Sequence, residues 1–440
     1  MHCKLKIVFG LLMVVMLLCG CGQITVDQMY AVPRRSAEYL DLQLAIDEAM
    51  DGMDYCAPLS GENRQSVQMA DLDGDGSDEY LLFVRDSSEH PLKIMIFTRD
   101  ESEYSLREII ESRGSGFELV EYADIDEEPG MELVVGCQLS DQVLRYLTVY
   151  SFASGDASQL LAVNYSKFLT VDFDADSGME LMVISPGDSA EENAVAALYH
   201  YADGTMTRSR QARLSEKSEN IKRIMVSCLY GGMPAVYVAS SVEESAIITD
   251  VFALKDGEFT NVSLSNESGT SVQTLRNHYV YAVDIDNDGT LELPCLMNML
   301  PVQNNMHSST QHLIRWYSMT LDGEEMDSMH TFHNFDGGWY VTLDRDWASR
   351  VSVTQESGTC TFYVWDETFE KAEKLLTVYA LTGSSRELDA ESGERFAVYK
   401  TDGVTYAAKL EVAALSYGLT KESLMNSFHL IHMDWKTGET

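Results

Sequence analysis

The sequence is poor in basic residues. It contains 31 Lys and Arg against 70 Asp and Glu, a formal net charge of −39 at pH 7. Affinity for nucleic acids comes largely from Lys and Arg that displace condensed counterions, and the same side chains attract proteins to anionic lipid headgroups. A surface this acidic repels both nucleic acids and anionic headgroups. Nucleic-acid binding is therefore excluded.

Proline is also scarce. The 440 residues include 8 prolines and 29 glycines, too few for long flexible linkers. Apolar residues make up 45% of the chain and aromatic residues 10%, which is ordinary for a folded protein. The acidic residues are therefore expected on the surface of a folded protein, and they do not indicate a disordered chain.

Long apolar runs are missing beyond the amino terminus. Lys4 and Lys6 precede an apolar run over residues 7–18, which is shorter than the roughly 20 residues that a membrane-spanning helix needs. Residues 1–20 are therefore interpreted as a signal peptide. Since no later segment is apolar enough to span a bilayer, the rest of the chain is expected outside the cytoplasm.

The end of this run, Leu18-Cys19-Gly20-Cys21, resembles the lipobox of bacterial lipoproteins. The resemblance implies that Cys21 becomes the first residue after cleavage and carries acyl chains, and two or three such chains suffice for stable anchoring. We expect a palmitate-bearing lipid anchor as the only membrane contact, with residues 21–35 as a tether. The alternative is a plain secretory signal that is cut nearby.

The remaining cysteines give no disulfide framework, because they are odd in number and widely spaced. They are Cys56, Cys137, Cys228, Cys295 and Cys360. We expect reduced, structural cysteines, several of them in apolar runs where a free thiol behaves as a small hydrophobe.

The most informative feature is an internal repeat of acidic segments. Four segments carry carboxylates at positions 1, 3, 5 and 9. These are Asp71, Asp73, Asp75 and Glu79; Asp124, Asp126, Glu128 and Glu132; Asp172, Asp174, Asp176 and Glu180; and Asp284, Asp286, Asp288 and Glu292. Their starts are 53, 48 and 112 residues apart, and 112 is two periods of 56, so one copy has lost its acids. It is expected near residue 228.

A second marker follows the acidic segments in step. It is a short apolar run that ends in aromatic residues and closes in a turn, and it occurs seven times. The first six runs include residues 94–97, 147–152, 198–201, 251–254, 314–317 and 362–365, and the seventh covers 396–399. Such runs are typical of strands and hairpins. Seven units of about four strands predict an all-β fold, a seven-bladed β-propeller over residues 36–435. A linear solenoid is the main alternative.

Short helices are expected at both flanks of the repeats. Ser36 is predicted to cap a helix that reaches residue 50, and Thr420 a helix that reaches residue 428. A strand over residues 429–435 could then complete the last blade.

The acidic segments, each feeding an apolar strand, resemble the FG-GAP/VCBS repeats of β-propellers, which occur in integrin α-chains and bacterial surface proteins. The resemblance covers about residues 65–410. It is strong for the first and fourth segments, good for the third, and weak for the second, where Glu128 and Pro129 replace the usual Asp and Gly. The later units depart from the motif, which leaves a blade count between six and eight.

The spacing of the acids predicts calcium binding. Alternate carboxylates in a tight turn point inward together, a glycine at position 6 gives the turn its backbone conformation, and the later acid closes the oxygen shell. Calcium is expected to be structural and weakly bound, as in other extracellular modules. The alternative is a solvated acidic turn, which suits the second segment best.

Catalytic motifs of the nucleophile-elbow, zinc-protease, Cys-x-x-Cys and phosphate-loop types are missing from the sequence. A zinc site is conceivable in a histidine cluster, although its spacing matches no known finger or enzyme. The cluster consists of His307, His312, His330 and His333. Paired carboxylates for glycoside cleavage cannot be singled out in so acidic a chain.

Two classes of function follow. The favoured one is a monomeric, non-enzymatic surface protein that binds a protein or a carbohydrate. Its candidate contacts are aromatic, with packing in the core as their alternative role: Trp316, Tyr317, Trp339, Tyr340 and Trp365. The competing class is a secreted polysaccharide-degrading lyase or hydrolase.

Overall fold

The computed structural model describes residues 37–100, 103–139, 145–189, 191–243, 246–278, 280–301 and 311–431. In this part of the chain the strands form six sheets, in which the neighbouring strands are antiparallel. The expected all-β fold is confirmed. The signal peptide, Cys21, the tether, Ser36, His307 and residues 432–435 lie outside the described residues.

The first three sheets follow one another along the chain. The first contains β1 (Asp54–Tyr55), β2 (Val67–Ala70), β3 (Glu79–Arg85), β4 (Leu92–Asp100) and β5 (Glu103–Ser112). The second contains β6 (Gly116–Ala123), β7 (Glu132–Gln138), β8 (Arg145–Ser151) and β9 (Ser158–Tyr165). The third contains β10 (Lys167–Val171), β11 (Glu180–Ser185), β12 (Val195–Ala202) and β13 (Thr205–Arg213).

The last three sheets are less regular. The fourth contains β14 (Ile221–Cys228), β15 (Pro234–Val242), β16 (Ala246–Lys255) and β17 (Glu258–Asn261). The fifth contains β18 (Leu293–Asn298), β19 (His312–Met319), β20 (Glu325–Asn334), β21 (Trp339–Leu343) and β27 (Phe428–Leu430). The sixth contains β22 (Val351–Glu356), β23 (Thr359–Trp365), β24 (Ala372–Thr382), β25 (Phe396–Lys400) and β26 (Val404–Leu410).

The helices are few and short. The α-helices of the described residues are α3 (Ala37–Ala49), α4 (Arg345–Ala348), α5 (Arg386–Ala390) and α6 (Lys421–Ser427), and the 3₁₀ turns are η1 (Ser218–Asn220), η2 (Val272–Thr274) and η3 (Val412–Tyr417). The predicted cap of α6 is confirmed, because the Thr420 side chain accepts the backbone N–H of Ser423. None of the described helices is long and apolar enough to cross a membrane.

The apolar core is divided into layers between consecutive sheets. In β3, successive side chains point to opposite faces, as in any strand. Leu81 and Phe83 pack with residues of the second sheet, such as Phe117. Further clusters lie between the second and third, third and fourth, fourth and fifth, and fifth and sixth sheets. Each sheet is therefore held mainly by its neighbours in the chain.

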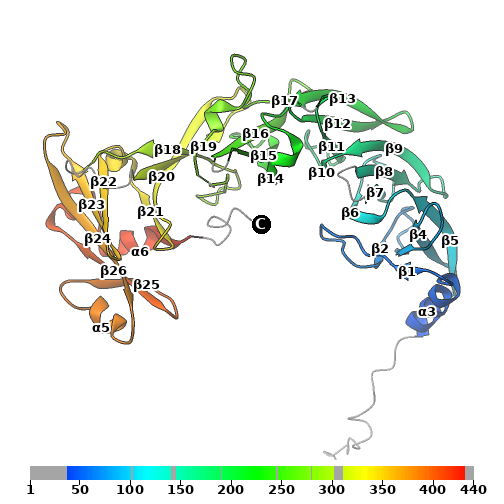
Figure 1. Ribbon diagram of the computed structural model, residues 1–440, viewed down its shortest axis with the longest axis horizontal. Helices are drawn as coiled ribbons and strands as arrows, with labels where there is room; N and C mark the ends of the chain where they lie inside the picture. The colour runs from blue at the N-terminus through cyan, green and yellow to red at the C-terminus, as the bar shows by residue number, and fades with distance from the viewer. Residues whose placement is uncertain are drawn as a thin grey trace, which may run out of the picture.

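The sheets follow an open arc, with the first sheet and the sixth at opposite ends (Figure 1). The outer face of the first sheet is covered by α3, since Leu42 and Ile46 pack against Leu82, Val84 and other residues of β3 and β4. Among the described residues, no apolar cluster joins the first sheet to the sixth. A closed ring is therefore not formed by this part of the chain.

The predicted count of seven blades is not confirmed. The sixth aromatic run lies in β23 and the seventh in β25, and both strands belong to the sixth sheet. The expected terminal strand also differs from the prediction: β27 begins at Phe428 and pairs with β21, so it completes the fifth sheet rather than the last one.

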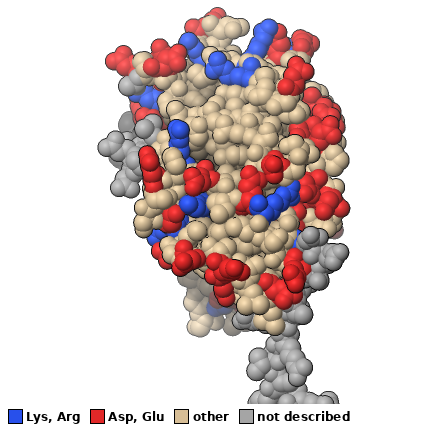
Figure 2. Space-filling model, turned by 90° about the vertical axis from the view of Figure 1, so that its right-hand side faces the viewer, with Lys and Arg blue, Asp and Glu red and all other residues tan. Residues whose placement is uncertain are grey.

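The surface is rich in acidic side chains, as the composition predicts. Figure 2 shows Asp and Glu side chains spread over the face at the α3 end of the arc, with Lys and Arg between them in smaller number.

The packing of α3 predicts unequal effects of two substitutions in one helix. The Ile46 side chain is 4% exposed and that of Leu44 is 68% exposed. Ile46→Ala should lower the free energy of unfolding by about 2–4 kcal/mol, because it leaves a cavity against the first sheet. Leu44→Ala should change it by less than about 0.5 kcal/mol. Urea unfolding of both variants measures the difference, and equal losses would contradict the covering role of α3.

Candidate metal centres

The acidic segments occupy one recurrent place in the fold. Three of them are the hairpin loops between the first two strands of the repeat, β2–β3, β6–β7 and β10–β11. The fourth is closed by the isolated bridge between Val283 and Glu292 and leads directly into β18. The acid-free copy expected near residue 228 joins β14 to β15, where the Leu229 N–H donates to the Met233 carbonyl at 2.7 Å. The repeat assignment is therefore confirmed for these five sheets.

Each acidic loop gathers three carboxylates. Oxygen atoms from positions 1, 3 and 9 lie within 4.8 Å of one another in all four loops, a spacing that could hold a metal ion. The sets are Asp71, Asp73 and Glu79; Asp124, Asp126 and Glu132; Asp172, Asp174 and Glu180; and Asp284, Asp286 and Glu292. The second loop, expected to be the weakest, brings its acids together as the others do.

The acids at position 5, Asp75, Glu128, Asp176 and Asp288, are not among these three-residue groups, and their prediction as further ligands stays a prediction. Three of them accept the backbone N–H two residues further on, at 2.7 Å in the first loop, 2.9 Å in the third and 2.8 Å in the fourth. A carboxylate that accepts a local N–H stabilises the turn itself. Position 5 therefore helps to shape the loop.

The loop conformation is built by hydrogen bonds to the cluster. Asp71 accepts the N–H groups of Gly74 at 2.8 Å and Gly76 at 3.0 Å, so one side chain fixes both ends of the turn. Gly76 has φ +86°, and the matching Gly289 has φ +91°. Only glycine adopts such angles at little cost, which confirms the reason given for glycine at position 6. In the third loop the same place is held by Ser177 at φ +85°.

The acid at position 9 is tied to the backbone in every loop. It accepts the N–H of position 2 at 2.8–3.1 Å, as in the pair Leu72 and Glu79. Burial, followed by the charges of neighbouring carboxylates, raises the pKa of Glu180 and Glu292 to about 7. Burial also raises the pKa of Glu132 to about 7. A bound cation would remove this cost, because it favours the ionised carboxylates.

A positively charged side chain from β5 lies against the first loop. Arg107 Nη1 in β5 lies 2.7 Å from Asp73 Oδ2 and 4.0 Å from Glu79 Oε1, and the guanidinium also donates to the Gly155 carbonyl of the second sheet. Within the described residues, no Lys or Arg lies within 4.0 Å of a carboxylate of the other three clusters. Arg107 therefore partly neutralises the first loop, which is predicted to be among the strongest calcium sites.

Serine hydroxyls support two of the other clusters. Ser151 donates to Asp126 at 2.9 Å, Ser318 to Glu292 at 2.9 Å and Ser328 to Asp286 at 2.6 Å. The sequence reasoning missed these residues and Arg107. A signal was present for two of them, since Ser151 and Ser318 each directly follow the tyrosine of the repeated aromatic run.

Adjacent loops are joined through their backbones. The Met131 N–H donates to the Asp71 carbonyl at 3.0 Å, and the Met179 N–H donates to the Asp124 carbonyl at 2.8 Å. A Cβ at Gly74 would lie 2.4 Å from atoms of Pro129, so this approach requires glycine. The first three loops therefore form one ladder across three sheets.

The aromatic residues predicted as ligand contacts do not form a binding surface. Trp316, Tyr317, Trp339 and Tyr340 are buried, so these four are core residues and not ligand contacts. Trp365 is half-buried and donates its indole N–H to Ser352 Oγ at 2.8 Å.

The predicted histidine cluster is dispersed as well. The His312 ring lies 5.4 Å from that of His278, whereas His333 stacks on Tyr340 at 4.9 Å. Among the described residues, no histidine belongs to a group that could hold a metal. The five cysteines are free, as expected.

Comparisons with known proteins do not assign this chain to a family. No family model matches the chain, and no curated protein matches it. Among solved structures, it is similar to a protein from Lactobacillus plantarum at 12% identity and a TM-score of 0.27, covering 72% of this chain and 86% of that one. At such a score the likeness assigns neither a fold nor an activity.

Two further solved structures have comparable scores. Rhamnogalacturonan lyase YesW matches at 11% identity with a TM-score of 0.31, covering 72% of this chain and 69% of that chain. The β-propeller domain of the trilobed protease from Pyrococcus furiosus matches at 11% identity with a TM-score of 0.28, covering 72% and 89%.

The raised acid pKa values predict an unusual pH dependence in the absence of metal. Glu132, Glu180 and Glu292 hold their protons up to a pKa of about 7 in the folded state, against an ordinary glutamate pKa of 4.5. The folded state therefore binds more protons than the unfolded state between these values, and stability falls as pH rises from about 4.5 to 7. The melting temperature in EDTA should fall from pH 5 to pH 7.5.

A metal ion should flatten this profile, because it competes with protons for the same carboxylates. The same scan in millimolar calcium is the control. A melting temperature in EDTA that rises steadily over this pH range would contradict the assignment of these three glutamates.

Proposed function

We propose that the chain is a calcium-stabilised binding module that is displayed outside the cytoplasm on a lipid anchor. The observation that carries the proposal is the recurrence of one three-carboxylate cluster in four hairpin loops of successive repeats. A cluster that served only as a solvated turn would have no reason to bury its glutamate: Glu132 is 2% exposed and Glu292 is 0% exposed. Burial of several acids together is favourable when a cation accompanies them.

Calcium suits these clusters better than magnesium or zinc. All donors are carboxylate oxygens, which hard cations prefer, and no histidine or cysteine joins any cluster of the described residues. Calcium accepts an irregular shell of six to eight oxygens, completed here by backbone carbonyls or water, whereas magnesium demands a regular octahedron. The second, third and fourth loops are the proposed calcium sites, because Arg107 partly neutralises the first.

The relation to FG-GAP/VCBS repeats belongs to this proposal too. It is supported by the acidic loops, by their place before an apolar strand, and by sheets that pack face to face along the chain. The proposed module is monomeric, binds no nucleic acid, and uses the exposed surface of its sheets for a protein or carbohydrate ligand. A catalytic role is not proposed, because the sequence carries none of the nucleophile, zinc-protease or phosphate-loop motifs.

Calcium should raise the melting temperature of the wild-type protein, and magnesium should raise it far less. At ten times its dissociation constant, each bound ion adds about 1.4 kcal/mol to the free energy of unfolding. The double variant Asp174→Asn with Asp286→Asn removes a cluster charge from two loops and should lose most of this stabilisation. Differential scanning calorimetry in EDTA, magnesium and calcium measures it.

The comparison pair is Asp176→Asn with Asp288→Asn, which changes the same loops at position 5, whose acids are not in the three-residue groups. Asparagine still accepts the local N–H, so the calcium effect should remain close to that of the wild type. Melting curves that are the same in EDTA and in excess calcium would show that these loops are acidic turns without a metal.

The anchor has its own test, because Cys21 lies outside the described residues. The Cys21→Ala variant has no thiol to acylate. Expressed in a bacterial host, it should lose palmitate labelling and move from the membrane fraction to the medium, while the wild type stays with the membrane. Continued membrane attachment of the variant would refute the lipid anchor.

A further inference from the structure

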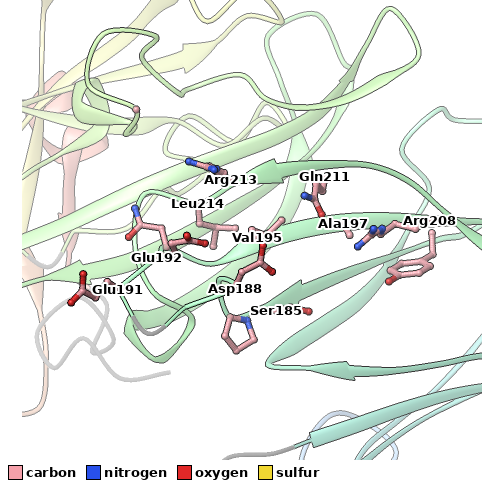
Figure 3. Close-up of a pocket in the computed structure, with 14 residues that line it drawn as sticks. Ser185, Asp188, Glu191, Glu192, Val195, Ala197, Arg208, Gln211, Arg213 and Leu214 are labelled. Carbon is pink, nitrogen blue, oxygen red and sulfur yellow. The ribbon is translucent and has the colours of Figure 1, made fainter.

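A cavity of about 370 Å³ lies on the third sheet, and none of its lining residues belongs to an acidic cluster. It opens beside Ser185, at the end of β11, whereas the acidic loop joins β11 at its beginning, Glu180. Its walls come from β12, β13 and the segment that leads into β12 (Figure 3). The cavity therefore opens at the end of β11 far from the acidic loop and extends along the sheet as far as Tyr199, which pairs with Leu181.

Strand pairing places the lining residues on one face. Tyr199 pairs with Arg208, Ala197 with Gln211, and Val195 with Arg213, and these six all line the cavity. Alternate residues of a strand point to the same side, so β12 provides an apolar and aromatic floor. Figure 3 shows Arg213, Gln211 and Arg208 following one another along β13. The β13 wall thus presents two guanidinium groups with an amide between them.

The two cavity arginines are exposed, and among the described residues neither forms an ion pair within 4.0 Å. Arg210, which lies between them on the same strand, pairs instead with Glu258 of β17 in the fourth sheet. In a chain with a net charge of −39, acidic partners are abundant. Arg208 and Arg213 therefore remain available to an anionic ligand, while Arg210 is engaged.

The opposite wall is acidic. Asp188, Glu191 and Glu192 line the cavity on the segment before β12, where Asn193 donates to the Ser215 carbonyl at 2.8 Å. A Cβ at Gly187 would lie 2.6 Å from the Glu192 Cβ, so the segment is closely folded. No ion pair of the described residues crosses the cavity. A ligand must offer negative charge to one wall and hydrogen-bond donors to the other.

The distance between the arginines limits the ligand further. They are five residues apart along β13, but a bulge shortens the strand between them, and their partners Tyr199 and Val195 on β12 are four residues apart, a span of about 13 Å. A ligand with several carboxylates along its length can therefore pair one carboxylate with each guanidinium. A sugar chain built of uronic acids carries one carboxylate on each ring for the arginines, hydroxyl groups that donate to the acidic wall, and an apolar ring face for Tyr199. An acidic peptide has the charge but lacks the rows of hydroxyl donors.

We propose that this cavity binds an acidic oligosaccharide composed of uronic acid units. Arg208 and Arg213 contact the carboxylates, Gln211 the hydroxyl groups between them, and Tyr199 the face of a sugar ring. The proposal rests on the proposed function, because it names the ligand class of the binding module. Its site is separate from the calcium loops, so the two can fail independently.

The test is isothermal titration of the full-length protein in detergent with trigalacturonate, in buffers that contain either calcium or EDTA. Arg208→Gln and Arg213→Gln should each weaken binding at least tenfold. Arg210→Gln, on the same strand but paired with Glu258, should leave the affinity within twofold of the wild type. The fully methyl-esterified trisaccharide, which has the same rings without the charges, should bind at least tenfold more weakly than trigalacturonate.

Four outcomes would overturn the proposal: no binding of trigalacturonate by the wild type, equal binding of the methyl ester, an equal loss in Arg210→Gln, or tighter binding of a triglutamate peptide. The calcium-induced rise in melting temperature is measured on the same samples. If that rise persists while uronate binding is missing, the cavity proposal fails and the calcium-stabilised module stands. If the rise is missing while the arginine variants lose binding, the reverse holds.

Discussion

The fold depends on one constraint: each of the first five sheets has two apolar faces, and both must be covered. In β3 the alternating side chains Leu81 and Phe83 face the second sheet, while Leu82 and Val84 face α3. Burying apolar surface stabilises at roughly 25 cal/mol per Å², so a sheet that is open on one face would lose the contribution of that layer. Consecutive sheets therefore stack face to face, and α3 covers the face that has no sheet before it.

This constraint also explains where the acidic loops lie. When sheets stack in the same orientation, the hairpins between their first and second strands come together at one end. The backbone contacts from Met131 to Asp71 and from Met179 to Asp124 are the result. Four carboxylate clusters thus accumulate on one side of the molecule, and their repulsion must be offset locally. Stacking determines the position of the loops, and electrostatics determines which side chains surround them.

The sequence predicted the strands and the loops well, because both are local patterns. Alternating apolar residues and turn residues determined the hairpins, and the spacing of the acids correctly located the clusters. The departures involve contacts between distant residues. Arg107 reaches Asp73 across 34 positions, and nothing near the first motif signals it. The blade count was inferred from seven aromatic runs, yet strand pairing combines the sixth and seventh in one sheet.

The same difference between local patterns and distant contacts applies to the residues that were candidates for binding a ligand. Trp316 and Trp339 were considered for binding because they are aromatic, but a large aromatic ring is also what a layer between sheets needs, and both are buried there. The cavity on the third sheet is lined mostly by residues outside the repeated pattern, although Tyr199 belongs to the third aromatic run. Its signal was the composition of β13, which holds Arg208, Arg210 and Arg213 in an acidic chain.

The five related loops solve one desolvation problem in different ways. A buried glutamate that closes a hairpin needs donors or positive charge around it. The first loop has a guanidinium, and the second and fourth have serine hydroxyls. In the third loop Glu180 is half-buried, and among the described residues it accepts only a backbone N–H. The acid-free copy lacks the glutamate, and there the Tyr237 hydroxyl donates to the Cys228 carbonyl at 3.0 Å. Because Arg107 supplies positive charge to the first loop, the need of that loop for a cation is smaller than that of the second and fourth, whose buried glutamates have only neutral donors. A metal that stabilises this protein therefore acts unevenly along the arc, less strongly in the first sheet than in the sheets that follow it.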